Sequence, residues 1–281
     1  MINLESLYHP VFHRPMHVAV FGSGSGTILR AILAAQKKSE QLHGRSPFAI
    51  KLLFTDRKCR FQQIAQEEKL PLIEHDHSNG PIQRQEYDLK GVEHFFSFVK
   101  KENLKIDFVL LAGYMRILGN PWLKVFSNRI LNVHPADLTL LDSKGKRQFT
   151  GSNSVFQALQ EGQKQTRSTV ILIDEKIDTG PIIVSGPWVQ YQGKYPITKE
   201  CAAAHQEKQK MFSDWPACFV ALQLVSQGRV KLHSETKKVF IDGIEQPSQG
   251  YEHSSAFFKY DQRGIVCVES LGLLGKNGFQ N

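Results

Sequence analysis

The first half of the chain alternates short apolar runs with longer stretches of helical periodicity. Short, mostly apolar runs predict buried strands at 17–21, 48–56, 70–74, 106–112 and 129–133. Apolar residues spaced three or four apart predict helices that begin after residue 26 and that cover 61–69, 91–102 and 121–127. Strands and helices that alternate in this order are typical of an α/β fold, in which helices cover both faces of a parallel sheet.

The second half of the chain has a looser pattern, which changes the expected sheet. Residues 138–150 contain few apolar positions and three basic ones, so we expect an exposed loop there. Further patterns predict helices at 152–160 and 198–226, strands at 169–173 and 182–185, and a hairpin formed by 229–232 and 238–241. A tight turn at 178–181 separates two of these strands and predicts an antiparallel C-terminal part of the sheet.

Composition narrows the class of protein. The chain has 281 residues, of which 41% are hydrophobic and 22% charged, and these values exclude a disordered chain, a collagen or a coiled coil. No apolar run reaches the roughly 18 residues of a membrane span, and the first residues do not resemble a signal peptide. The cysteines lie far apart without metal-binding spacing, at positions 59, 201, 218 and 267. We therefore expect a cytoplasmic protein with reduced thiols, no metal and no membrane partner.

The net charge of +8 leaves two interpretations open. The basic residues are spread along the chain in short groups, which favours a solvated surface, with a small anionic substrate as the alternative. No nucleic-acid partner is expected from this distribution.

A glycine-rich turn, Gly22-Ser-Gly-Ser-Gly26, stands between the first strand and its helix. Backbone N–H groups in such a turn approach a phosphate closely, and the helix N-terminus favours the negative charge. The turn is not a Walker loop, because no Gly-Lys-Ser/Thr follows, and it fits the dinucleotide fingerprint poorly although Asp56 ends the next strand. A phosphate site is favoured over a turn without ligand or a full dinucleotide site.

Three further residues form a chemically coherent set. Asn132 and His134, in Asn-Val-His-Pro135, end a strand, and Asp178 lies in the turn after a later strand. Taken singly, they are a capped strand end, a packed histidine and a turn-forming aspartate. Taken together, an amide and an imidazole stabilise an oxyanion, while the carboxylate supports the imidazole or takes a proton. This set suits direct attack by a substrate amine on an acyl carbon, without a protein nucleophile.

The ordered motifs of the chain resemble the folate-dependent formyltransferases from about residue 17 to residue 251. The motifs that carry the resemblance cover 23–32, 109–118, 132–135, 174–181 and 240–251. The resemblance implies a Rossmann-like formyltransferase fold, with a twisted, mostly parallel sheet and an antiparallel C-terminal part. It implies a formyltransferase domain at 16–253, with extensions at 1–15 and 254–281.

The resemblance also implies roles for individual residues. Asn132, His134 and Asp178 would be catalytic. The phosphate of the substrate would be bound at Ser25, Gly26, Thr27 and Ile28. The co-substrate 10-formyltetrahydrofolate would be bound by Arg84, Met115, Arg116, Ile117, Leu118 and Glu175, with no metal. The match at 240–251 favours the branch of the family that formylates glycinamide ribonucleotide in purine synthesis, acting on small molecules as a monomer or homodimer.

Departures from the family pattern keep alternatives open. The basic segment 141–150 replaces a shorter loop, Ile28 stands in place of an asparagine, and Asp214 is the candidate for a glutamate that contacts the ribose. The longer loop motivates a second hypothesis, a different phosphorylated or sugar amine as acceptor. A folate- or nucleotide-binding module without turnover is the third, and the intact Asn132, His134 and Asp178 argue against it.

Overall fold

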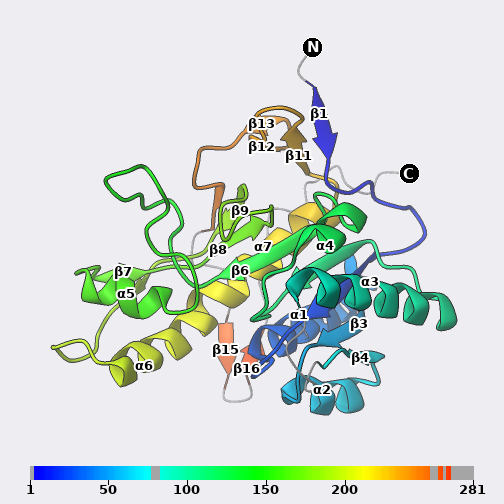
Figure 1. The fold of residues 1–281 in the computed structure, drawn as a ribbon, viewed down its shortest axis with the longest axis horizontal. Helices are drawn as coiled ribbons and strands as arrows, with labels where there is room; N and C mark the ends of the chain where they lie inside the picture. The colour runs from blue at the N-terminus through cyan, green and yellow to red at the C-terminus, as the bar shows by residue number, and fades with distance from the viewer. Residues whose placement is uncertain (1–2, 77–82, 254–258, 262–263, 267–281) are drawn as a thin grey trace.

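An eight-stranded mixed sheet forms the centre of the molecule (Figure 1). The computed structural model describes residues 3–76, 83–253, 259–261 and 264–266. From one edge of the sheet to the other, the strands are β14 (Tyr251–Glu252), β9 (Ile182–Ser185), β8 (Thr169–Leu172), β6 (Ile130–His134), β5 (Phe108–Leu111), β2 (Met16–Phe21), β3 (Phe48–Thr55) and β4 (Leu72–Glu74).

The direction of the strands follows the predicted division of the chain. Strands β2, β3, β4, β5 and β6 run parallel to one another. Strand β8 is antiparallel to β6, with His134 opposite Thr169 and Leu131 opposite Leu172, and β9 is antiparallel to β8. The predicted fold, mostly parallel with an antiparallel C-terminal part, is confirmed.

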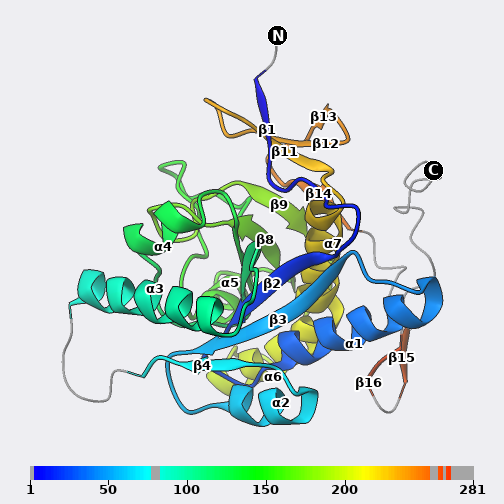
Figure 2. The same cartoon turned by 90° about the vertical axis from the view of Figure 1, so that its right-hand side faces the viewer.

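Helices cover both faces of the sheet (Figure 2). One face carries α1 (Thr27–His43), α2 (Arg60–Glu68) and α7 (Trp215–Ser226), and the other carries α3 (Arg84–Lys101) and α4 (Asn120–Val125). Successive side chains of a strand point to opposite faces. In β2, Val18 and Val20 therefore join the first apolar cluster, and Ala19 and Phe21 join the second.

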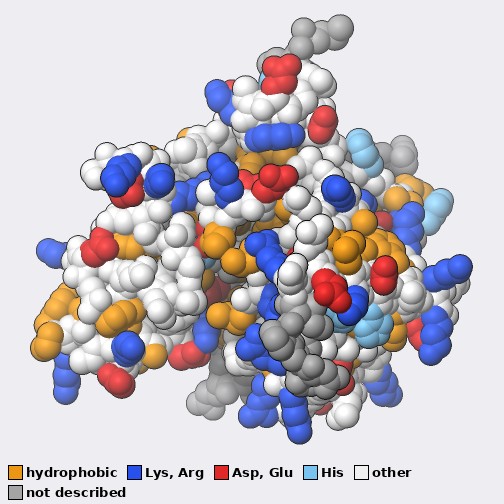
Figure 3. Space-filling view, in the orientation of Figure 1, with side chains coloured by type: hydrophobic (Ala, Val, Ile, Leu, Met, Phe, Trp, Pro, Cys, Tyr) orange, Lys and Arg blue, Asp and Glu red, His pale blue; other side chains and the backbone are white. Residues whose placement is uncertain are grey.

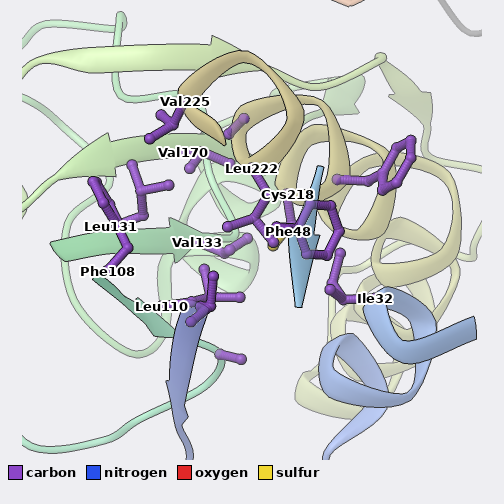
Figure 4. Close-up of a cluster of buried hydrophobic side chains, with 14 of the residues drawn as sticks. Ile32, Phe48, Phe108, Leu110, Leu131, Val133, Val170, Cys218, Leu222 and Val225 are labelled. Atoms are coloured by element: carbon purple, nitrogen blue, oxygen red, sulfur yellow. The ribbon is translucent and has the colours of Figure 1, made fainter. Parts of the chain in front are cut away.

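Helix α7 lies deep in the first cluster. Every residue from Pro216 to Ser226 is buried, and a helix that is apolar on all sides is found in the interior of a protein. Figure 4 shows Cys218, Leu222 and Val225 of this helix facing strand residues that include Leu131 and Val170. This packing holds the strands β6 and β8, which carry the motifs of chemical interest.

The predicted long helix 198–226 contains a π-helical turn. Helix α6 (Lys199–Gln209) continues through the π-helical residues Lys210–Asp214 into α7. Proline lacks an N–H group, and its ring clashes with the carbonyl four residues earlier in an α-helix. Pro216, at the start of α7, accounts for the wider turn that precedes it.

The remaining elements complete the sequence of the fold. They are α5 (Ser154–Gln160), β7 (Gln165–Thr166), β10 (Val189–Gln190), and a small sheet of β1 (Leu4–Ser6), β11 (Val230–His233), β12 (Val239–Ile241) and β13 (Ile244–Glu245). The predicted hairpin at 229–241 is confirmed as β11 and β12. Among the described residues, no helix is both long and apolar enough to cross a bilayer.

The two predicted extensions differ in what the structure describes. Residues Leu4–Ser6 pair with β11, and the Arg14 guanidinium binds both carboxylate oxygens of Asp107. Of 254–281, the structure describes a hairpin, β15 (Lys259–Asp261) with β16 (Gly264–Val266), which lies near α1 in Figures 1 and 2. The domain boundaries at 16 and 253 stay predictions.

Candidate active site

Asn132 and His134 lie at the carboxyl end of β6 and share one face of the sheet. Leu131 and Val133, which alternate with them, point into the core beneath α7. His134 is buried and Asn132 is half-buried. In the orientation of Figure 1, the surface of the molecule is hollowed near its middle, with hydrophobic side chains and lysine or arginine side chains around the hollow (Figure 3).

The segment 173–181 brings Asp178 to His134 by turning back over the sheet. Because β8 runs antiparallel to β6, its carboxyl end lies beside the start of β6, where Ile173 N donates to Ile130 O at 3.1 Å. Five residues later, Oδ2 of Asp178 lies 3.4 Å from Nδ1 of His134. A Cβ on Gly180 would lie 1.8 Å from the Leu172 carbonyl oxygen, so the return requires glycine.

Both ring nitrogens of His134 face protein groups. Nε2 lies 2.7 Å from the carbonyl oxygen of Phe149, and a carbonyl only accepts, so Nε2 carries a hydrogen. Nδ1 faces the carboxylate of Asp178. Burial lowers the pKa of His134, and the nearby Asp178 carboxylate opposes that shift. Asp178 is thus the counter-ion that favours a charged imidazole in a buried position.

The loop 138–150, which departs from the family pattern, contacts Asp178 and His134 directly. Arg147 Nη1 donates to the backbone oxygen of Asp178 at 2.5 Å. Gly151 N donates to Oδ2 of Asp178 at 2.9 Å. Together with the Phe149 carbonyl, these groups contact both His134 and Asp178 from the same stretch of chain.

The glycine turn leads into α1 without a side-chain cap. Gly26, the N-cap of α1, has φ of 66°, and no side chain caps the helix, so its first N–H groups have no intrahelical partner. Ser25 is exposed and Thr27 half-buried. The side chain of Ile28 is buried in the core, so only its backbone is left to contact a phosphate.

The structure brings Arg84 next to the segment 115–118, and both belong to the predicted folate site. Arg84, on the first turn of α3, donates from Nη2 to Leu118 O at 2.8 Å. Met115 and Ile117 are exposed, whereas the Leu118 side chain is buried and the Arg116 guanidinium lies 3.7 Å from the centre of the Tyr87 ring. Glu175 is exposed on the segment 173–181, away from this pair of elements in sequence.

Asp214 lies in the π-helical turn and is buried. Gln209 Nε2 lies 3.3 Å from its Oδ1 and also donates to the carbonyl oxygen of Pro135 at 3.0 Å. Burial raises the pKa of Asp214 to about 6. The carboxyl group therefore belongs to a buried polar cluster beside the Pro135–Ala136 peptide.

Side chains suited to a metal do not gather in the described part of the chain. No group of three or more His, Cys, Asp or Glu side chains is placed to hold an ion there. Cys59, Cys201 and Cys218 are free thiols, and Cys267 lies outside the described residues.

Residues 16–200 match the family model described as formyl transferase. The chain belongs to the formyl transferase family. The matched range contains β2 through β9, with the glycine turn, the end of β6 and the segment 173–181. The chain is 34% identical over 173 residues to a phosphoribosylglycinamide formyltransferase of Mycobacterium tuberculosis. The alignment covers 62% of this chain and 71% of the relative.

Solved structures agree with the family assignment. A glycinamide ribonucleotide transformylase 1 from Symbiobacterium toebii superposes with a TM-score of 0.63 at 27% identity, covering 83% of this chain and 98% of the other. A phosphoribosylglycinamide formyltransferase from Coxiella burnetii reaches a TM-score of 0.68 at 22% identity, with coverage of 86% and 100%, and shows the shared fold.

Proposed function

We propose that this protein transfers the formyl group of 10-formyltetrahydrofolate to the amine of glycinamide ribonucleotide, a step of purine synthesis. The observation that carries the proposal is the placement of Asn132 and His134 on one face at the end of β6, with Asp178 3.4 Å from His134. The named relatives support the choice of acceptor, since the matched mycobacterial protein is a phosphoribosylglycinamide formyltransferase.

The chemistry follows from the groups present. The amine nitrogen attacks the formyl carbon, and the carbonyl oxygen becomes an oxyanion that accepts a hydrogen bond from the Asn132 amide. The charged imidazole of His134, whose two nitrogens face Phe149 O and Asp178, stabilises the negative charge electrostatically. Asp178 supports the imidazole and assists transfer of the proton from the attacking nitrogen, directly or through water. The bond from the formyl carbon to N10 of the folate then breaks, N10 takes the proton, and tetrahydrofolate leaves.

Separate groups of residues would bind the ribonucleotide phosphate and the folate. The backbone of Ser25, Gly26, Thr27 and Ile28 at the start of α1 would hold the ribonucleotide phosphate. Arg84 and residues 115–118, with Glu175, would bind the folate, and no metal takes part. We place the protein in the cytoplasm, as a monomer or a homodimer.

A panel of amine acceptors tests this proposal. Purified protein is mixed with 10-formyltetrahydrofolate and glycinamide ribonucleotide, and the absorbance of tetrahydrofolate is followed; parallel reactions contain other phosphorylated amines and amino sugars. We expect kcat/KM to be highest with glycinamide ribonucleotide. A higher kcat/KM with another amine would show that glycinamide ribonucleotide is not the preferred acceptor. Folate binding without formyl transfer to any amine would overturn the proposal.

A further inference from the structure

Asp178 adopts a backbone conformation that requires support from its surroundings. Its φ is 54°, in the left-handed region that residues with a side chain enter only at an energetic cost. In this conformation its carboxylate faces Nδ1 of His134. Such a residue stays in place only when neighbouring groups hold it.

The holding groups come from the chain between residues 147 and 151. Arg147 Nη1 binds the backbone oxygen of Asp178, and Gly151 N binds its carboxylate. The Gly151 N–H holds the carboxylate, and the Arg147 guanidinium holds the carbonyl group that follows the Cα atom of Asp178. One loop therefore binds both the backbone and the side chain of Asp178.

Hydrogen bonds and packing within the loop hold it in place. Residues 141 and 147 form an antiparallel bridge, and Gln148 N donates to Leu140 O at 3.0 Å. The Asp142 carboxylate accepts from two backbone N–H groups at the tip of the loop, each at 2.8 Å. Phe149 is buried against Ala136 and Ala158, which anchors the base of the loop.

We propose that Arg147 is a positioning residue of the active site, which holds the backbone of Asp178 so that its carboxylate faces His134. The half-buried guanidinium is suited to this role, since an arginine donates through several N–H groups in a fixed plane. The basic loop that departs from the family pattern thus belongs to the catalytic apparatus and is more than a solvated insertion.

The direction in which the pKa of His134 moves when Arg147 is lost tests the proposal. Asp178 raises the pKa of His134, whereas Arg147 lowers it by a smaller effect. If Arg147 only supplied charge, its loss would raise the pKa of His134. If Arg147 holds Asp178, its loss removes the stronger influence of the carboxylate, and the pKa falls.

The experiment compares Arg147→Met with Arg147→Lys and with Lys144→Met, which removes the same charge from an exposed position of the same loop. The titration of the His134 Cε1–H signal is followed by NMR, with the signal assigned by its absence in His134→Gln. This readout needs no turnover, so it separates failure of this inference from failure of the proposed function, on which the kinetic readout rests. Circular dichroism checks that each variant is folded.

We expect Arg147→Met to move the His134 titration to lower pH, in the same direction as Asp178→Asn, and to lower kcat about ten-fold. Arg147→Lys restores part of both, and Lys144→Met changes neither. In an Asp178→Asn background, Arg147→Met lowers kcat no further, because it acts through Asp178. A titration that is unmoved or moves to higher pH overturns the proposal; if Arg147→Met does not fold, Arg147→Gln is judged by the same outcomes.

Discussion

Nδ1 of His134 lies 3.4 Å from Oδ2 of Asp178, although the two residues belong to segments that leave opposite ends of neighbouring strands. The contact places a carboxylate beside a buried imidazole whose other nitrogen donates to the Phe149 carbonyl. Burial lowers the pKa of His134, and the contact with Asp178 opposes that effect most strongly.

The first prediction concerns Asp178→Asn. The amide has a similar shape but carries no charge, so the pKa of His134 falls and any limb of the pH profile that reports His134 moves to lower pH. We expect kcat to fall by about 10²-fold or more, the range of general acid–base effects. The pH dependence of kcat measures both changes. A limb that stays at its wild-type pH would show that Asp178 does not act on His134.

The second prediction concerns the glycine turn. In Gly26→Ala, the new Cβ lies 2.5 Å from Cδ1 of Ile64, and the residue must keep a φ of 66°. We expect the free energy of unfolding to fall by at least about 1 kcal/mol from the backbone strain, and KM for the ribonucleotide to rise. Chemical denaturation and steady-state kinetics measure these quantities.

Gly24→Ala is the matched control for stability, because its Cβ meets no atom within 4 Å and Gly24 has no left-handed backbone. Its free energy of unfolding should stay at the wild-type value. Equal stability of the two variants would contradict the role assigned to the conformation of Gly26.

The third prediction concerns Arg84, whose side chain binds Leu118 O at 2.8 Å. Arg84→Ala removes this support of the segment 115–118 and a cation at the expected folate site, so KM for the folate should rise about ten-fold. Lys90→Ala, an exposed change on the same helix, serves as the control. An unchanged KM for the folate in Arg84→Ala would remove Arg84 from the site.

The fourth prediction concerns Asp214, whose pKa is raised by burial from 3.8 to about 6. Because the pKa is higher in the folded state, the neutral carboxyl contributes to the free energy of unfolding in full below pH 3.8, the pKa of the unfolded chain. This contribution is lost as the pH rises through about 6. Asp214→Asn stays neutral, so its advantage in free energy of unfolding over the wild type should grow by about 2 kcal/mol between pH 4 and pH 8. Urea denaturation at both pH values measures the gain, and an equal difference at the two would contradict the burial of a titrating carboxyl.

The strands and most helices could be predicted because burial on both faces leaves uninterrupted apolar runs, as in 18–21 and 108–112. Helix α3 begins at Arg84, seven residues before the predicted start at Gly91. Its first two turns are mostly polar, with only Tyr87 and Asp88 buried, so no apolar periodicity marks them.

Part of the site could be predicted from the local sequence, and part depends on tertiary packing. Asn132 and His134 could be placed together because they are two residues apart on one strand. The approach of Asp178 depends on the antiparallel direction of β8 and on the return of 173–181, which are long-range features. The contacts of Arg147 and Phe149 also come from tertiary packing, and the local pattern of 138–150 indicated only an exposed loop.

The most direct test of formyl transfer by Asn132, His134 and Asp178 is kcat at saturating 10-formyltetrahydrofolate and glycinamide ribonucleotide, measured for wild type and Asn132→Ala. Asn132 is half-buried on β6, and its loss removes one oxyanion donor. We predict turnover by the wild type and a loss of roughly 10²–10³-fold in kcat for the variant, with little change in either KM. Wild-type kcat in Asn132→Ala, or no formyl transfer by the wild type, would contradict this mechanism.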